Sequence, residues 1–118
     1  MRALTLQELH NLAMNIVGRM LEAEGYEFMG VNSALHKNPQ FVCLKDKQLH
    51  FIVVRPVIHP NNPREWDHLL LNKIKKHAKA QHGRTYYAGV GLSNAANQDL
   101  PVYLNEPYIV DYDGLIQV

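Results

Sequence analysis

Apolar residues near the N-terminus recur every three or four positions, the spacing of an amphipathic helix. Thr5 and Glu8 stand three residues apart, as in a capping box that satisfies two backbone amides at a helix start. Gly25 is suited to the left-handed conformation with which many helices end. The sequence therefore predicts a first helix that Thr5 caps and Gly25 ends. Its expected buried stripe is Leu9, Leu12, Ala13, Ile16, Val17 and Met20.

A second helical pattern follows the turn-rich segment 59–63, which reads His-Pro-Asn-Asn-Pro. Asn62 is a suitable cap, Pro63 suits the first helical position, and Glu65 lies in the first turn. Gly83 is expected to end this helix. Its expected inward stripe is Trp66, Leu69, Leu70, Ile74 and Ala78.

Elsewhere the hydrophobic period changes to two, which is typical of β-strands. The expected strands are Tyr26–Val31, Gln40–Leu44, Gln48–Arg55, Thr85–Val90, Leu100–Leu104 and Tyr108–Tyr112. Residues 45–47 separate the second and third of these, so we expect a hairpin there. Phe51–Val54 is continuously apolar, which indicates a strand that is covered on both faces. The pattern predicts a single α/β domain over residues 1–118, of α+β character, with one mixed sheet and two main helices.

The length of 118 residues suits one domain, and its single cysteine excludes a disulfide framework and any thiolate-rich metal centre. No apolar run approaches the ~20 residues that span a bilayer, so we expect a cytoplasmic protein with no membrane contact. The seven histidines lack the spacing of a helical zinc site, and we expect neither a metal nor a cofactor. Cys43 lies in an apolar strand and is expected to be a small buried hydrophobe.

The net charge of +1 conceals a segregation along the chain. Residues 45–84 carry nine basic and three acidic residues, whereas residues 85–118 carry four acidic residues and no lysine or arginine. A basic segment of this kind suits nucleic acid or an acidic protein surface. The alternative is an ordinary solvated helix face. The candidate contacts to phosphate or to such a partner are Arg55, Arg64, Lys73, Lys75, Lys76, Lys79 and Arg84, with Lys45 and Lys47 beside them.

Over residues 5–92, the order helix, three strands, helix, strand resembles the restriction-endonuclease-like fold, and Holliday-junction-resolvase-like nucleases look closest. That resemblance implies a metal held by an Asp on the second strand, a Glu-x-Lys on the third strand and a Glu of the first helix. The positions here that correspond to this site hold Gln40, Val53, Arg55 and Met14. These residues do not hold a magnesium ion, so the resemblance implies a nuclease scaffold without nuclease chemistry. Arg55 can still contact phosphate, or it is simply a charge at a strand end.

Several segments resemble a small bacterial family of uncharacterised proteins: ELHNLAMNIVGR, NPQFVCLK, TYYAGVGL and LPVYLNE. Some members of that family are labelled as a component of the sodium-translocating NADH-quinone reductase. That activity needs a four-cysteine cluster and flavin and nicotinamide sites, which a chain with one cysteine does not supply.

Three functions remain open at this point. The first is a non-catalytic binding protein that uses the basic middle segment. The second is a homodimeric interaction module in which the C-terminal strands pair between protomers. The third is an enzyme of unknown type that uses histidines and aspartates, such as Asp111 and Asp113 on one face of a strand.

Overall fold

The computed structural model describes all 118 residues, which form two helices and six strands. The order of helix, three strands, helix and C-terminal strands agrees with the sequence prediction, and the fold is α+β. The elements, in chain order, are α1 (Leu6–Ala23), β1 (Glu27–Val31), β2 (Phe41–Lys45), β3 (Gln48–Ile58), α2 (His68–Ala80), β4 (Arg84–Asn94), β5 (Tyr108–Asp111) and β6 (Ile116–Gln117).

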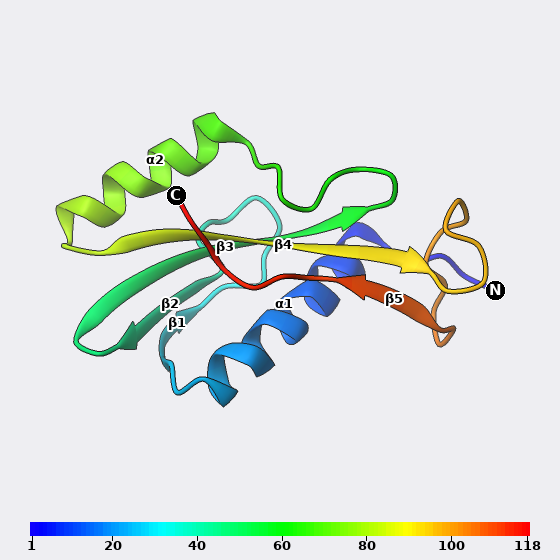
Figure 1. Ribbon diagram of the computed structural model, residues 1–118, viewed down its shortest axis with the longest axis horizontal. Helices are drawn as coiled ribbons and strands as arrows, with labels where there is room; N and C mark the ends of the chain where they lie inside the picture. The colour runs from blue at the N-terminus through cyan, green and yellow to red at the C-terminus, as the bar shows by residue number, and fades with distance from the viewer.

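The strands form one mixed sheet, as predicted, and its order is β1-β2-β3-β4-β5 (Figure 1). The first three strands are an antiparallel meander, and β3 then pairs parallel with β4. Parallel neighbours need a crossover, which α2 provides. Both C-terminal strands run antiparallel to β4, β5 along residues 91–94 and β6 along residues 86–87.

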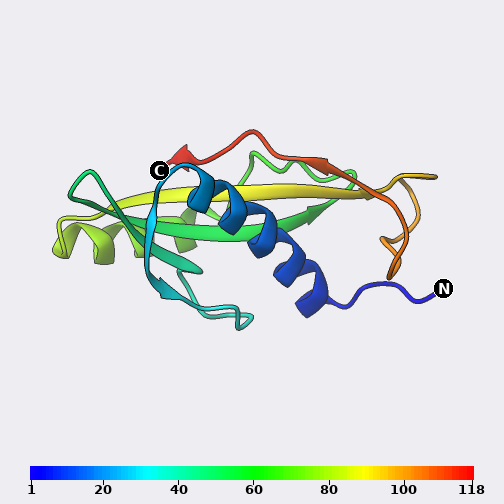
Figure 2. The same ribbon diagram turned by 90° about the horizontal axis from the view of Figure 1, so that it is seen from below.

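The two helices cover opposite faces of the sheet, as the two views show (Figures 1 and 2). Side chains alternate along β3, so Ile52 and Val54 join the core under α1, whereas Val53 packs with Leu71 of α2. All three β3 residues are fully buried. The prediction of a strand covered on both faces is therefore confirmed.

Helix α1 begins as predicted. The Thr5 side chain accepts a hydrogen bond from the Glu8 amide, and the Glu8 carboxylate accepts one from the Thr5 amide at 2.9 Å. Gly25 follows the helix with a φ of +84°, the conformation for which glycine is suited. Neither α1 nor α2 combines the length and the hydrophobicity that a crossing of the bilayer requires.

The predicted start of the second helix was wrong. Asn62 forms only an isolated turn, and Asp67 is the actual cap, whose side chain accepts a hydrogen bond from the Leu70 amide at 3.1 Å. The loop before the helix lies on β4, since a Cβ at Gly89 would stand only 1.9 Å from the Pro63 carbonyl oxygen. The predicted stripe was also wrong in part: Leu69 is 85% exposed, and Leu71 is the buried leucine.

The predicted strand Leu100–Leu104 was wrong as well. This segment makes a single bridge, between Tyr103 and Ala3, and lies beside the N-terminal residues instead of in the sheet. Pro101 has no amide to donate to a ladder, which explains why regular pairing does not develop. Strand β6 was not predicted, because two residues carry no recognisable period.

Candidate functional site

Arg55, near the end of β3, is held by neutral oxygen atoms. Its Nη2 donates to Asn38 Oδ1 at 2.7 Å, and its Nη1 donates to Gln40 Oε1 at 3.2 Å and to the Val54 carbonyl at 2.9 Å. No carboxylate forms an ion pair with the guanidinium. Burial lowers the pKa of Arg55, and the smaller Coulomb effects of Tyr87 and Asp67 oppose that shift. The result is a partly desolvated cation without a counter-ion.

Gln40 connects this cation to the sheet. It is 1% exposed, and its Oε1 also accepts a hydrogen bond from the Val54 amide at 2.8 Å. Its Nε2 donates to the Lys37 carbonyl at 2.7 Å and to Asn38 Oδ1 at 3.1 Å. The structure thus brings together Gln40 and Arg55, two of the four positions that correspond to the nuclease site.

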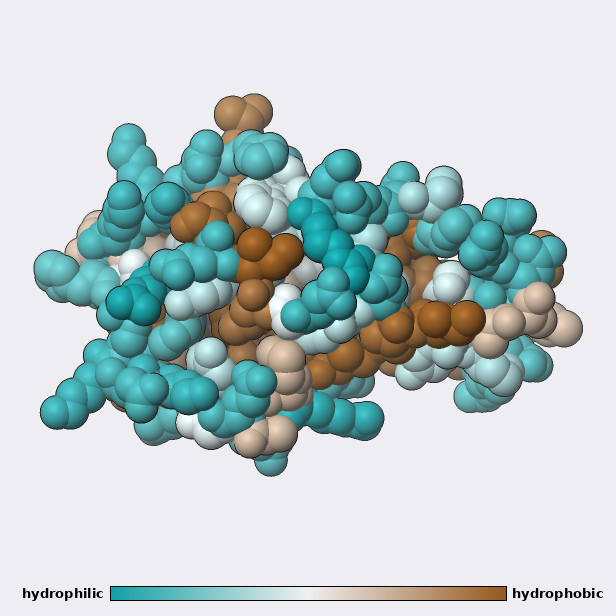
Figure 3. Space-filling model, in the orientation of Figure 1, coloured by the Kyte–Doolittle hydropathy of each residue, from teal (hydrophilic) through white to brown (hydrophobic).

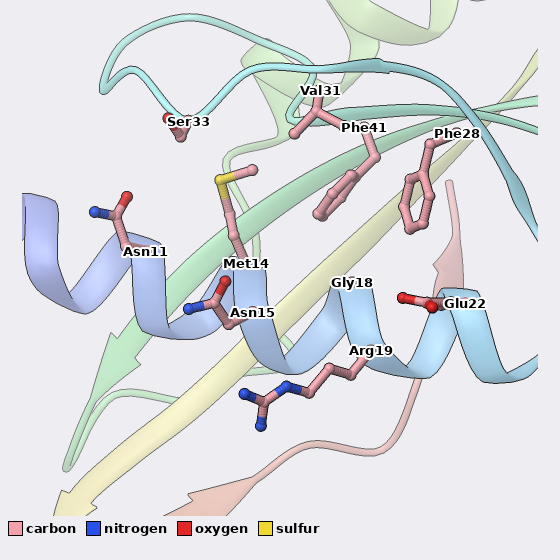
Figure 4. A pocket seen from close by; sticks show the side chains of 10 residues that line it. All are labelled: Asn11, Met14, Asn15, Gly18, Arg19, Glu22, Phe28, Val31, Ser33 and Phe41. Atoms are coloured by element: carbon pink, nitrogen blue, oxygen red, sulfur yellow. The ribbon is translucent and has the colours of Figure 1, made fainter.

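The other two positions lie apart. Val53 is buried against Leu71 and Tyr87 on the α2 face of the sheet. Met14 lies on the opposite, α1 face, where it projects toward Phe41 in a groove of about 510 Å³ between α1 and β1 (Figure 4). Both side chains are apolar, so neither adds chemistry to the Arg55 site.

A second cavity, of about 440 Å³, contains Arg55 and lies where the N-terminal ends of both helices meet the strand. From α1 it is lined by Leu6 and His10, and from the N-terminal end of α2 by Asp67 and Leu70. His10 is 2% exposed, and its Nε2 has no hydrogen-bond partner. Burial of the ring lowers the pKa of His10, and the positive charge of Arg55 lowers it further. We call this the Arg55 cavity.

Sequence reasoning missed His10. The polar α1 residue in the Arg55 cavity is His10, one helical turn before Met14. A signal existed, because His10 stands one residue after Leu9 and three before Ala13, both members of the buried stripe. A polar residue that a helix buries beside its apolar stripe needs a partner, and here the protein supplies none.

The basic residues of the middle segment gather mainly at the other end of α2. Lys73, Lys76 and Lys79 are exposed on its outer side, and Lys75 is half-buried. Hydrophilic side chains cover this part of the surface (Figure 3). None of these lysines forms an ion pair, and residues 68–98 contain no acidic residue.

Three further bases lie at the same end of the molecule, in the β2–β3 hairpin and at the start of β4 (Figure 1). The hairpin is joined to the turn after α2 by a hydrogen bond from Gln48 Nε2 to the His82 carbonyl at 2.8 Å. His50 of β3 is the register partner of Arg84. We define the basic surface as the α2 lysines with these three bases: Lys45, Lys47, Lys73, Lys75, Lys76, Lys79 and Arg84.

Arg64 does not belong to the basic surface. Its Nη2 forms ion pairs with Asp111 at 2.5 Å and with Asp113 at 2.6 Å. The hydrogen bond from Arg64 lowers the pKa of Asp111 and raises that of Arg64 itself. The two aspartates that the sequence placed on one face are therefore used to bind an arginine.

Other reactive side chains lie apart. No three His, Cys, Asp or Glu side chains lie close enough together to hold a metal ion. Cys43 is fully buried, as predicted, and burial raises the pKa of its thiol to about 11. A thiol in this environment is not ionised near neutral pH, and the thiolate is the nucleophilic form.

Comparison with known proteins identifies the family of this chain. No curated protein and no solved structure has detectable similarity to the chain. Residues 7–118 match the family described as a domain of unknown function, DUF8840. The match includes α1 from its second residue, α2 and the whole sheet, with the basic surface and all of the Arg55 cavity except Leu6. The chain therefore belongs to the DUF8840 family.

Proposed function

We propose that this protein is a non-catalytic nucleic-acid-binding protein that contacts the phosphate backbone through the basic surface. One observation carries the proposal: seven basic side chains lie at one end of the molecule, and none of them is paired with a carboxylate. The order of the elements, which resembles that of nucleases, is consistent with the proposal, because contacts from lysine and arginine to phosphate do not need the carboxylates that cleavage requires. The expected cytoplasmic location is part of the same proposal.

The lysines on the outer side of α2 are spaced in a way that suits a phosphate backbone. Lys73, Lys76 and Lys79 follow one another at three-residue intervals, a rise of about 4.5 Å each along the helix. Double-stranded DNA presents a phosphate about every 3.4 Å of axis on each strand. Flexible lysine side chains tolerate the remaining mismatch, because they act as point charges without a fixed geometry.

The test is the affinity for a short DNA duplex, measured by fluorescence anisotropy at several salt concentrations. Each phosphate that is neutralised contributes a slope of about −0.9 to the logarithm of affinity against the logarithm of salt. The double variant Lys76→Gln/Lys79→Gln should reduce this slope by about 2 and weaken binding by about 10-fold or more at low salt. The matched control, Arg19→Gln/Lys37→Gln, removes the same charge from other parts of the surface.

Equal effects of the two double variants would show that net charge, and not the basic surface, controls the affinity. DNA binding that does not depend on salt, or no binding at all, would also contradict the proposal. Salt-dependent binding to an acidic polypeptide such as polyglutamate, with none to DNA, would favour an acidic protein partner instead.

A homodimer formed at a sheet edge is a second candidate. Strand β5 has its outer edge free, with Ile109 54% and Val110 41% exposed, and a hydrophobic band follows this strand in Figure 3. The opposite edge, β1, is interrupted by an irregularity between Phe28 and Gly30. Because bulges hinder pairing between edges, β5 is the better candidate.

Light scattering at increasing protein concentration tests this second candidate. Ile109→Lys should convert a dimer to a monomer, whereas Met29→Lys on β1 should leave the dimer intact. A wild-type protein that stays monomeric at high concentration would contradict the homodimer.

A further inference from the structure

We propose that the Arg55 cavity binds a phosphate group, with Arg55 as its cation and His10 as a second donor. This site is distinct from the basic surface. Its residues come from α1, the loop between β1 and β2, β3 and the N-terminal end of α2, whereas the lysines lie on the outer side and toward the C-terminal end of α2. The inference therefore goes beyond the proposed function and does not depend on it.

The hydrogen bonds of Arg55 leave room for a ligand. A guanidinium has five N–H donors, and the protein accepts three of them, through Asn38, Gln40 and the Val54 carbonyl. The remaining two donors are on Nε and Nη2. A partly buried charge without a counter-ion is unfavourable, and an anion that accepts two parallel hydrogen bonds removes this penalty.

His10 provides the independent observation. Its side chain is almost completely buried, lines the cavity, and has an Nε2 without a protein partner. Buried polar atoms without partners are rare in folded proteins, so such an atom calls for an explanation. Because Nε2 is covered in this structure, a turn of the ring that brings its N–H to the cavity lets His10 donate to an oxygen atom there. An oxyanion between His10 and Arg55 satisfies both side chains.

The helices add a favourable field. Leu6 is the first residue of α1, and Leu70 lies in the first turn of α2, and both line the cavity. A helix carries about half a positive charge at its N-terminus, which favours anions. Donors from α1 and β3, with the positive end of α2 on a third side, suit a tetrahedral group with three free oxygens better than a planar carboxylate.

Asp67 is the acidic residue of the cavity lining and opposes an anion. Its carboxylate is engaged as the cap of α2, where it accepts a hydrogen bond from the Leu70 amide. This arrangement offers a precise test, because asparagine caps helices as well as aspartate does. Asp67→Asn removes the opposing charge and keeps the helix start.

The experiment titrates the wild-type protein with inorganic phosphate and follows the His10 ring signals by NMR. Binding should shift these signals in a saturable way. Asp67→Asn should lower the dissociation constant for phosphate by about 3-fold or more. Leu6→Glu places a negative charge at the rim, without touching the hydrogen bonds of Arg55, and should weaken binding by a similar factor, while Leu6→Gln should change it little.

Arg55→Lys keeps the charge but removes the paired donors, and should weaken phosphate binding by about 10-fold or more. If Arg55→Lys fails to fold, the Leu6 and Asp67 variants still decide the question. Lys76→Gln/Lys79→Gln should bind phosphate as the wild type does, which separates this site from the basic surface.

Two further titrations identify the source of the phosphate. A nucleoside monophosphate represents a small molecule, and an oligonucleotide with a 5′-phosphate represents the end of a nucleic acid. Either one supports the site if its binding depends on Arg55 and Asp67 as described. No saturable shift of the His10 signals, equal affinity for acetate, or affinities unchanged in the Leu6→Glu and Asp67→Asn variants would overturn the proposal.

Discussion

The side-chain oxygen of Gln40 takes the place of a main-chain acceptor for the amide of Val54, at a distance of 2.8 Å. Gln40 stands just before β2 begins, and its own amide donates to the Ile52 carbonyl at 3.0 Å. The glutamine thus continues the β2–β3 ladder with its side chain and at the same time accepts a hydrogen bond from Arg55. Sheet pairing and the Arg55 cavity depend on the same residue.

Gln40→Ala should therefore be strongly destabilising. It leaves the Val54 amide without its acceptor and creates a cavity, and together these effects are expected to cost about 3 kcal/mol of unfolding free energy. Urea unfolding followed by circular dichroism measures this loss. Gln98→Ala, at an exposed glutamine, serves as the matched control and should change the stability by less than about 0.5 kcal/mol. A similar small change in Gln40→Ala would contradict the role given to this residue.

His10 should make stability depend on pH. Its pKa is lowered in the folded protein, so between the unfolded value near 6.5 and the lower folded value the unfolded chain binds more protons. The contribution of neutral His10 to stability is fully present above pH ~6.5 and decreases as the pH falls below that value. His10→Met should remove this contribution. The substitution also eliminates an unpartnered buried nitrogen. At pH 8 the unfolding free energy of His10→Met should therefore be at least that of the wild type, and up to about 1 kcal/mol higher.

The pH dependence of unfolding in urea, compared between wild type and His10→Met, measures the effect. His50 is also buried with a lowered pKa and contributes in the same direction, so the difference between the two proteins is the relevant quantity. A difference that stays constant from pH 8 to pH 5 would be inconsistent with a buried neutral His10.

Two glycines should respond in opposite ways to alanine. At Gly89 a Cβ would stand 1.9 Å from the Pro63 carbonyl oxygen, so Gly89→Ala must displace the loop before α2 and should cost more than about 2 kcal/mol. At Gly18, inside α1, the nearest atom to a Cβ is 3.4 Å away in the Phe41 ring. Gly18→Ala should stabilise the protein by about 0.5–1 kcal/mol, because alanine favours the helix. Thermal unfolding of both variants checks the opposite signs.

Glu8 should contribute to stability against acid. Hydrogen bonds from Arg2 and then from the Thr5 amide lower its pKa from 4.5 to about 2. Because the folded pKa is depressed, this contribution is present above pH ~4.5 and is lost as the pH falls toward 2. Glu8→Gln keeps a capping side chain but does not titrate. The advantage of the wild type over Glu8→Gln, measured by urea unfolding, should therefore shrink between pH 5 and pH 2.5, and an advantage independent of pH would refute this assignment.

The elements that were predicted correctly are those with local causes. The capping box of Thr5 and Glu8, the glycine after α1 and the apolar run of β3 are defined by neighbours in sequence, and the structure confirms each. The start of α2 is not defined by neighbours in sequence. Asn62 and Asp67 are both suitable caps, and the choice between them depends on the loop that brings Trp66 against Tyr87, with ring centroids 5.5 Å apart.

The candidate sites divide in the same way. Local composition was sufficient to indicate the lysines of α2 and their acid-free surroundings. It did not show that Arg64 is neutralised by aspartates almost 50 residues later in the chain, or that His10 of the first helix shares a cavity with Arg55. Periodicity and capping are short-range properties that the sequence by itself determines. Which charges from distant parts of the chain come together depends on how the strands pair and the helices pack on them, and only the tertiary structure decides that.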